Sequence, residues 1–393
     1  MRTVAEDPFE LGISVTEAAV LHDRLREAGP AIQATDPDGI PVWVITRYDD
    51  VSRLLVDPRI VNKRPGGPSG SPGLKLPPAL AANLLNLWPE DHRRIRALAA
   101  PAFSRRRVGS VREMIQRCVD ELLDAIEPNS AEPVDLMTAL TAPLPVMVIT
   151  ELLGIGPDDA REFRAAAAEV MSVDPSDTAS DAVRVPAMTK IVIVLMKVIH
   201  EKRTHPGDDV ISEWIAARDE EDKLTEEELM SLAFLVFLAG FENSVHQIAN
   251  AIGVLIGEDR SELLTTLDDE PRWRERVQKL LFEAAPGSFA IRRFPLDDII
   301  IGDVTIPAGS PLYLSLRAAT ADPDRGDRPE LFFGRGPHYC LGADLAVMQL
   351  DITTRSVFKR FPSLISAEDL TSLPMRMSWR THGPVRLPAF TEH

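Results

Sequence analysis

The feature that most constrains the fold is an apolar run at residues 229–241, which acidic residues border on both sides. A helix that spans a bilayer needs about 20 apolar residues, and this run is shorter. Thr225 and Glu228 stand three positions apart just before it, which is the spacing of a capping box and predicts the start of a helix. We therefore expect a long helix that continues towards Gly257 and lies buried inside a protein rather than in a membrane.

The rest of the chain is typical of a mainly α-helical protein with a small β region. Apolar residues recur at helical spacing in residues 111–126, and a further helix is predicted at 341–361, where Pro362 ends it. Strands are predicted in three short segments with β-type composition: 32–45, 299–316 and 375–387. The first of these segments contains an Asp-Pro-Asp-Gly turn.

Composition and charge indicate a single cytoplasmic protein domain. The formal charge of −17 opposes binding to phosphate backbones, so nucleic acid is not an expected partner. Two cysteines cannot form a disulfide framework or a cysteine-rich metal site, and the first residues lack the apolar segment of a signal peptide. The hydrophobic pattern is the same on both sides of a Pro- and Gly-rich stretch at 64–78, so we interpret that stretch as a surface loop and residues 1–393 as one domain.

The segment with the most chemical information is the loop at residues 333–342, in which Cys340 lies between glycines. It precedes a predicted helix, and a helix N-terminus with free backbone N–H groups favours a thiolate. A single thiolate of this kind could be a nucleophile or one axial ligand of a haem. The ligand cluster that zinc requires and the motif of a phosphate-binding loop are both missing from the sequence. Cys118, on the apolar face of its helix, is predicted to be a core residue.

Phe333, Gly336, Cys340 and Gly342 reproduce a Phe-x-x-Gly-x-x-x-Cys-x-Gly signature, and through them the chain resembles the cytochrome P-450 family of haem-thiolate monooxygenases. The likeness extends along almost the whole chain and is greatest to soluble actinobacterial members. It implies a single triangular domain, mainly α with a small β region, in which haem b lies between the long central helix and the helix after the cysteine loop. It also implies that Cys340 ligates the iron, that Phe333 shields the sulfur and that Gly342 admits the porphyrin.

The resemblance assigns four further residues to the haem propionates. His92 and Arg96 match the family's His-x-x-x-Arg helix segment and stand one helical turn apart, so they can point the same way. Arg292 falls where the family places another propionate arginine. His338, two residues before the cysteine, is the fourth.

A local reversal of charge surrounds the first two of these residues. Residues 92–107 hold six arginines and no acidic residue, within a chain of net charge −17. In the family this region borders the face on which small acidic ferredoxins dock, and a basic surface suits such a partner. The resemblance therefore implies that electrons arrive from NAD(P)H through a reductase and a ferredoxin.

The central helix departs from the family at one position. Ala239, Gly240 and Glu242 match the motif Ala-Gly-x-acid-Thr, which opens a groove for dioxygen and relays protons to it, but Asn243 stands where the threonine is expected. An amide donates a hydrogen bond but passes a proton poorly. Glu242 and Asn243 are therefore the candidate catalytic residues of an altered relay.

A second departure affects the family's Glu-x-x-Arg pair. Residues 279–282 read Lys-Leu-Leu-Phe at its expected place, and the segment 323–333 is shorter than the meander that normally contacts the pair. Replacing both members of a buried ion pair leaves no unpaired charge, so the fold is not excluded.

We therefore expect a monooxygenase that oxidises a small organic molecule in bacterial secondary metabolism, such as polyketide biosynthesis. Its pocket is expected to be lined by the 64–78 loop and by apolar residues of two other segments: Phe234, Leu235, Leu238, Ala239, Phe289, Ala290 and Ile291. Two alternatives stay open, a non-catalytic helper of a partner enzyme and a haem enzyme that uses peroxide or couples substrate radicals. The sequence also leaves open whether the substrate is free or bound to a carrier protein.

Overall fold

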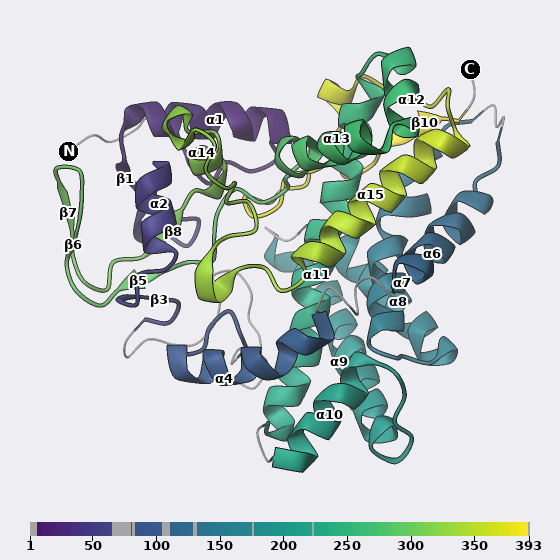
Figure 1. Ribbon diagram of the computed structural model, residues 1–393, viewed down its shortest axis with the longest axis horizontal. Helices are drawn as coiled ribbons and strands as arrows, with labels where there is room; N and C mark the ends of the chain where they lie inside the picture. The colour runs from purple at the N-terminus through teal and green to yellow at the C-terminus, as the bar shows by residue number, and fades with distance from the viewer. Residues whose placement is uncertain are drawn as a thin grey trace.

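The computed structural model of the chain describes residues 6–64, 80, 83–103, 111–128, 132–174, 177–221 and 224–391. Helices fill one side of the molecule, and most of the short strands lie on the other side beside the N-terminal helices (Figure 1). The α-helices of the described residues are α1 (Val15–Ala28), α2 (Tyr48–Leu54), α4 (Pro89–Ala99), α6 (Arg112–Asp124), α7 (Pro143–Leu152), α8 (Pro157–Met171), α9 (Asp181–Thr204), α10 (Val210–Glu221), α11 (Glu226–Ile256), α12 (Arg260–Asp268), α13 (Glu270–Glu283), α14 (Leu316–Thr320) and α15 (Ala343–Arg360).

The strands form small sheets that join distant parts of the chain. They are β1 (Ala31–Thr35), β2 (Pro41–Ile45), β3 (Ile60–Val61), β4 (Val134–Asp135), β5 (Phe294–Pro295), β6 (Ile299–Ile301), β7 (Val304–Ile306), β8 (Leu312–Leu314), β9 (Ile365–Ser366) and β10 (Pro388–Phe390). The sheets have the orders β1-β2-β8, β4-β10-β9, β3-β5 and β6-β7. In the first, β1 and β2 are antiparallel with Ala31 opposite Ile45, and β8 lies parallel to β2, so segments that are far apart in the sequence share one sheet.

The hairpin of β1 and β2 and the β6–β8 region confirm two of the three β predictions. In the hairpin turn, Asp36 Oδ1 accepts hydrogen bonds from the N–H groups of Asp38 (3.1 Å) and Ile40 (2.9 Å). The third prediction is wrong in extent, because residues 375–387 contain only the single bridge between Met375 and Pro384. The strand of this region, β10, begins after the predicted segment.

Helix α11 is the predicted central helix and passes through the middle of the helical side (Figure 1). Its N-terminus has the expected capping box, in which the Thr225 side chain accepts from the Glu228 N–H while the Glu228 side chain accepts from the Thr225 N–H. By length and composition α11 could cross a membrane, but 56% of its most apolar window is buried inside the protein. It packs against α15 and α7, as expected for a core helix.

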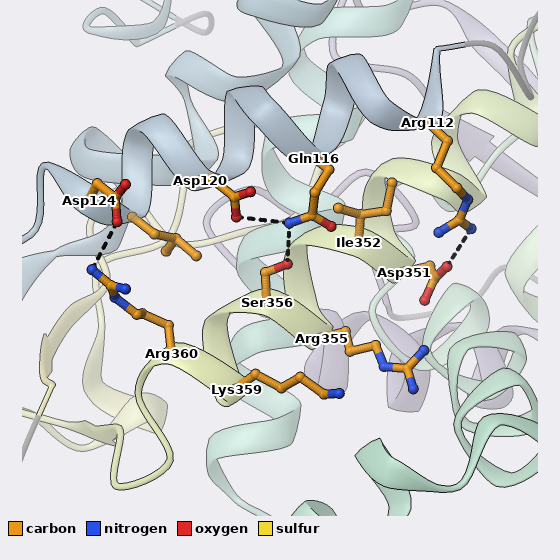
Figure 2. A pocket seen from close by; sticks show the side chains of 11 residues that line it. Arg112, Gln116, Asp120, Asp124, Asp351, Ile352, Arg355, Ser356, Lys359 and Arg360 are labelled. Atoms are coloured by element: carbon orange, nitrogen blue, oxygen red, sulfur yellow. Dashed lines mark hydrogen bonds and ion pairs between the residues drawn. The ribbon is translucent and has the colours of Figure 1, made fainter.

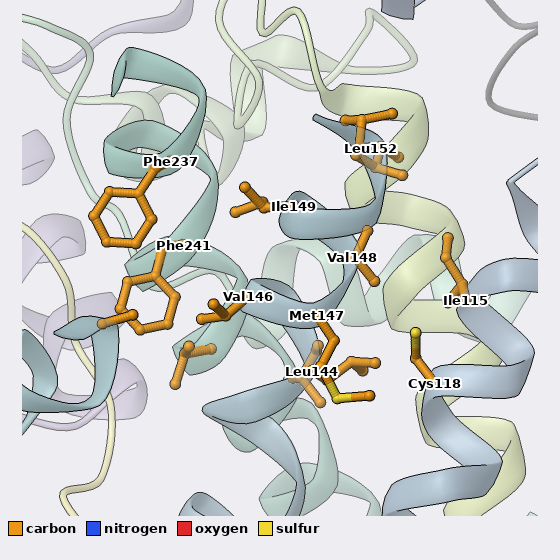
Figure 3. Packing of buried hydrophobic residues seen from close by; sticks show 14 of the residues in the cluster. Ile115, Cys118, Leu144, Val146, Met147, Val148, Ile149, Leu152, Phe237 and Phe241 are labelled. Atoms are coloured by element: carbon orange, nitrogen blue, oxygen red, sulfur yellow. The ribbon is translucent and has the colours of Figure 1, made fainter. Parts of the chain in front are cut away.

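The largest core cluster extends over most of the helical side and includes residues of α6, α7 and α11. Cys118 and Ile115 of α6 face the buried side chains of α7, and the other side of α7 meets Phe237 and Phe241 of α11 (Figure 3). Cys118 is buried, and burial raises the pKa of its thiol to about 12. The prediction that Cys118 is a core residue is therefore confirmed, and its thiol is not a candidate for chemistry.

Candidate active site

The loop before α15 is closed by its own backbone. The Cys340 N–H donates to the Phe333 carbonyl (2.9 Å), and the Tyr339 N–H donates to the Gly336 carbonyl (3.0 Å). Gly336 has φ +71°, and a Cβ atom there would lie 2.5 Å from Val56 Cγ1. A glycine is therefore required at position 336, both by the backbone conformation and by the close approach of Val56, which follows α2.

Cys340 is exposed, but protein surrounds it closely on its other sides. This burial raises the pKa of the Cys340 thiol, while the Gly342 N–H and the Arg96 guanidinium lower it. The expected backbone contribution is thus present in the Gly342 N–H, just before α15 begins at Ala343, although desolvation outweighs it and the charge of Arg96. A Cβ atom on Gly342 would meet nothing within 4 Å, so space for a flat group adjoins the thiol.

A cluster of cationic and histidine side chains lies beside this loop. His92 of α4 is buried, and the centroid of its ring is 3.9 Å from that of His338. Arg96, one turn further along α4, donates to the Tyr339 carbonyl. Arg293 is also buried and donates to Asn62 Oδ1, and Asn62 Nδ2 is 3.1 Å from His338 Nε2. We refer to His92, Arg96, Arg293 and His338 as the cationic cluster.

The cationic cluster has the electrostatics of an anion site. Burial lowers the pKa of His338 to about 2, and every charged neighbour that adds to this shift, Arg293, His92 and Arg96, is a base. The pKa of His92 falls to about 4 for the same reasons. His92 Nε2 and Arg293 Nε are buried without a hydrogen-bond partner. Buried donors of this kind fit the carboxylates of the haem that the resemblance implies.

Arg292 does not join the cationic cluster, contrary to the prediction. Its guanidinium lies over the Phe294 ring, 5.2 Å from the centroid, whereas its neighbour Arg293 points into the cluster. Arg293 is bridged to Leu312 of β8, so the backbone is extended here and successive side chains point to opposite faces. The residue that sequence reasoning missed is thus Arg293, and the available signal was the next arginine in the same extended segment.

Helix α11 divides its polar residues between two faces. Ala239 and Asn243, one turn apart, are exposed although the helix is otherwise a core element, and Asn243 Nδ2 makes a long bond of 3.4 Å to the Ala239 carbonyl. Gly240 is half-buried, and a Cβ atom there would contact only Ile149 at 3.6 Å. This face of α11 is therefore open beside small side chains, as the predicted oxygen groove requires.

Glu242 is turned towards the C-terminal segment instead. It accepts from Arg376 Nε (2.7 Å) and from the Thr381 hydroxyl (2.8 Å), and Arg376 also donates to the Met171 carbonyl at the end of α8 (3.1 Å). Burial raises the pKa of Glu242, but Arg376, His246 and the Thr381 hydroxyl lower it below its ordinary value. Glu242 is thus a carboxylate already engaged by two donors, and neither donor was predicted.

The predicted pocket residues separate into two groups. Phe234 and Leu235 of α11 are buried in the core, and Leu238 is half-buried against it. Phe289, Ala290 and Ile291 line a cavity of about 130 Å³ together with other residues of the same region: Arg292, Tyr313, Trp379 and Arg380. Of the loop at 64–78, the structure describes only Arg64.

At the expected place of the Glu-x-x-Arg pair, residues 279–282, the structure shows other contacts. Lys279 pairs with Glu275 on the exposed side of α13 (2.8 Å), and Phe282 is half-buried. Arg317 of α14 is buried, donates from Nε to Ser288 Oγ (3.2 Å) and bonds the Ala285 carbonyl just after α13. This arginine, which sequence reasoning did not single out, now ties α13 to α14.

The short segment before the cysteine loop is held by its own arginines. Arg325 Nε donates to the Thr320 carbonyl (2.9 Å), and Arg328 Nε donates to the Arg325 carbonyl (2.8 Å). The Tyr48 hydroxyl donates to the Pro329 carbonyl (2.8 Å), which fixes the segment against α2. A compact turn therefore replaces the longer meander.

The basic stretch at 92–107 is described as far as Phe103. Arg93 is exposed, whereas Arg94 pairs with Glu228 (2.5 Å) and Arg96 turns inward to the cysteine loop. Arg105, Arg106 and Arg107 lie outside the described residues.

A groove of about 680 Å³ lies between α6 and α15, the helix that follows the cysteine loop (Figure 2). Two of its arginines pair within the groove, Arg112 with Asp351 (2.9 Å) and Arg360 with Asp124 (2.8 Å), whereas Arg355 and Lys359 pair with Glu270 and Asp268 outside it. Gln116 Nε2 donates to Asp120 Oδ1 (2.9 Å). The groove is therefore a polar surface of mixed charge and not a uniformly basic one.

Comparison with known proteins gives relatives over the whole chain. No protein-family model matches. The chain is 32% identical to cytochrome P-450 107B1 of Saccharopolyspora erythraea over 410 residues, which cover 98% of each protein. It is 31% identical to mycinamicin IV hydroxylase/epoxidase of Micromonospora griseorubida over 386 residues, covering 93% of this chain and 94% of the other. The solved structure of the ligand-free P-450 monooxygenase TamI is 33% identical, with a TM-score of 0.83 over 95% of this chain and 91% of that chain.

Proposed function

The chain belongs to the cytochrome P-450 family, and on this premise we propose that Cys340 is the thiolate ligand of its haem iron. The protein is a monooxygenase that uses haem b and oxidises a small organic substrate. The observation that carries the assignment of Cys340 is its place: an accessible thiol next to Arg96 and to a buried cationic cluster that contains no acid. Haem, when bound, supplies the activation of dioxygen.

The cationic cluster is assigned to the two haem carboxylates. His92, Arg96, Arg293 and His338 would donate charge-assisted hydrogen bonds, each worth about 1.5–3 kcal/mol. Gly342 leaves room for the ring next to Cys340, and Ala239 and Gly240 of α11 are assigned to border it. Phe333 would cover the Cys340 sulfur. Its backbone carbonyl accepts a hydrogen bond from the Cys340 N–H, which holds the two residues next to each other.

The experiment that tests the haem ligand is a reduced carbon-monoxide difference spectrum of wild type and Cys340→Ser. Only a thiolate ligand gives the red-shifted band, so wild type should show it and the variant should lose it. A wild-type protein without the band would favour the non-catalytic helper, and a variant with the wild-type spectrum would move the ligand elsewhere. Cys118→Ser is the matched control, because that thiol is buried in the core and should leave the band unchanged.

The proton relay is assigned to Glu242 and Asn243, with the Thr381 hydroxyl as a third member. Asn243 lies on the open face of α11, where its amide can hold a ligand but not pass a proton readily. A water or a substrate hydroxyl would complete the relay, so the site should serve its own substrate better than analogues. Asn243→Thr should raise product formed per NAD(P)H consumed for analogues, because a general acid–base group typically accelerates a proton-transfer step by about 10²–10⁴-fold. Unchanged coupling with analogues would contradict this assignment.

We propose that the substrate belongs to bacterial secondary metabolism; the relative from Micromonospora griseorubida is named as a hydroxylase/epoxidase of mycinamicin IV. Electrons come from a redox partner, and we assign this role to an acidic ferredoxin because Arg93 is exposed on α4 near the cysteine loop. The rate of reduction by such a ferredoxin should fall as salt concentration rises. A rate independent of salt would place docking on an uncharged surface.

A further inference from the structure

We propose that the cavity beside β8 binds a carboxylate, so that the substrate of this monooxygenase is an organic acid held by one end. The proposal rests on the proposed function and names its substrate class. The cavity is enclosed by the extended segment 289–292, by Tyr313 of β8, and by Trp379 and Arg380 of the C-terminal segment.

The cavity is too small for a whole substrate and could hold only one end of it. Its volume is about 130 Å³, whereas pockets for whole drug-sized ligands hold roughly 300–1,000 Å³. Its walls are rigid aromatic rings: the centroid of Tyr313 is 5.4 Å from that of Trp379 and 5.7 Å from that of Phe289. A cavity of this size holds one functional group with a few carbon atoms and leaves the rest of the substrate outside it.

The polar groups of the cavity are all suited to an anion. Arg292 and Arg380 both line it, and each is close enough to Tyr313 to lower the pKa of its hydroxyl, which burial raises. The Tyr313 side chain is 1% exposed; Arg292 is placed to donate to its oxygen, whereas its hydroxyl proton has no acceptor among the described residues. A buried donor without an acceptor costs roughly 1–3 kcal/mol, so an acceptor placed here would be stabilising.

Aromatic rings hold the two guanidinium groups in place. Arg380 lies over the Trp379 ring at 4.1 Å from the centroid, and Arg292 lies over Phe294 at 5.2 Å. Arg292 lowers the pKa of Arg380, as does burial, so the two like charges are near each other. Planar guanidinium groups with a phenol O–H beside them present several donors, which match the two oxygens of a carboxylate.

The described carboxylates near this cavity do not accept from Tyr313. Asp36 is close enough to raise the pKa of Tyr313, but its Oδ1 accepts from two backbone N–H groups of its own turn and its Oδ2 is buried without a hydrogen-bond partner. Glu242 accepts from Arg376 and Thr381. Asp38 raises the pKa of Arg380 but does not line the cavity. None of the described residues thus gives the Tyr313 hydroxyl an acceptor, and the carboxylate of a substrate would supply one.

The test uses the holoenzyme and phenylalkanoic acids of increasing chain length, each paired with its neutral amide, with affinity read from the ligand-induced shift of haem absorbance. We expect at least one acid to bind tenfold or more tightly than its amide. Arg292→Gln and Arg380→Gln should remove that preference, and Tyr313→Phe, which keeps the ring, should reduce it. Arg360→Gln, an exposed arginine of the α6–α15 groove, is the matched control and should keep it.

Two outcomes overturn the proposal: no acid in the series binds more tightly than its amide, or the preference survives in Arg292→Gln, Arg380→Gln and Tyr313→Phe. The carbon-monoxide difference band is recorded for every variant. If the band is present while the preference is missing, the carboxylate subsite fails and the haem-thiolate assignment stands. If the band is missing from wild type, the proposed function itself fails.

Discussion

Two buried arginines, Arg293 and Arg376, occupy opposite electrostatic situations. Both are nearly inaccessible, at 2% and 8% exposed. Arg376 Nε lies 2.7 Å from Glu242 Oε1, and its other donors meet backbone carbonyls at the end of α8. Arg293 has Asn62, His92 and His338 as described neighbours, and none of these is an acid.

The difference distinguishes a structural contact from a binding site. A buried charge is costly unless it is paired, so an internal ion pair needs nothing further. A buried guanidinium among histidines needs an anion from outside the chain, and the haem carboxylates would supply it. The comparison therefore predicts that the Glu242–Arg376 pair contributes to the stability of the protein, in addition to the relay role proposed for Glu242, and that Arg293 serves the retention of haem.

The largest effect is expected from breaking the Glu242–Arg376 pair on one side. Glu242→Ala leaves Arg376 buried without its carboxylate, which should lower the free energy of unfolding by about 3 kcal/mol, the lower end of the range for buried pairs because Glu242 is partly exposed. Urea unfolding measures this loss. The double variant Glu242→Gln with Arg376→Met, which removes both charges, should recover most of it; equal losses in the single and double variants would show that the pair is not what stabilises this region.

The next effect concerns haem and uses neighbouring residues as variant and control. Arg293→Met should weaken haem binding by about 1.5–3 kcal/mol, which is roughly 10–150-fold, because one charge-assisted contact is lost. The measurement is the rate of haem transfer to an excess of apomyoglobin. Arg292→Met should leave that rate unchanged, since its side chain points to the opposite face. Faster transfer from the Arg292 variant than from the Arg293 variant would restore the original assignment.

This pair of arginines shows how far the sequence could lead. The cysteine loop, His92, Arg96 and His338 were identified because their signals are local in sequence, and the start of α11 followed from its capping box. In an extended segment a slip of one residue moves a side chain to the other face, so nothing in the local sequence distinguished Arg292 from Arg293.

Long-range contacts could not be predicted from the sequence. Arg376 is 134 residues from Glu242, and local patterns say nothing about which distant segment covers a helix. The same limit explains the strand predicted at 375–387: its residues are occupied by contacts with α8 and α11 and form one bridge instead of a ladder. Residues that tie such segments together, Arg317 among them, become visible only in the folded chain.

The smallest effect per pH unit is a pH dependence of the free energy of unfolding, which we expect from the region around the Glu242–Arg376 pair. His246, one turn after Glu242 on α11, is buried with both ring nitrogens lacking a hydrogen-bond partner, and a Cβ atom on Gly383 would lie 2.4 Å from its Nδ1. Burial lowers the pKa of His246 to about 4; Glu242 opposes this shift and Arg376 adds to it. From the C-terminal segment, His382 also faces this histidine, and the pKa of His382 is likewise lowered to about 4.

Because the folded pKa of His246 lies below the unfolded value of about 6.5, the unfolded chain takes up a proton first as pH falls. Stability should therefore be constant with respect to this group above pH 6.5 and decline between about pH 6.5 and 4, by at most about 1.4 kcal/mol per pH unit. Glu242, whose folded pKa is lowered, loses its contribution only at more acid pH, so the interval from pH 6.5 to 5 reports on the buried histidines, and a His246 variant separates its share from those of His92, His338 and His382. Urea unfolding across this interval should give a shallower slope for His246→Asn than for wild type. Parallel slopes would mean that His246 binds its proton equally well in the folded and unfolded chain, and would remove it from the groups that make this buried region sensitive to acid.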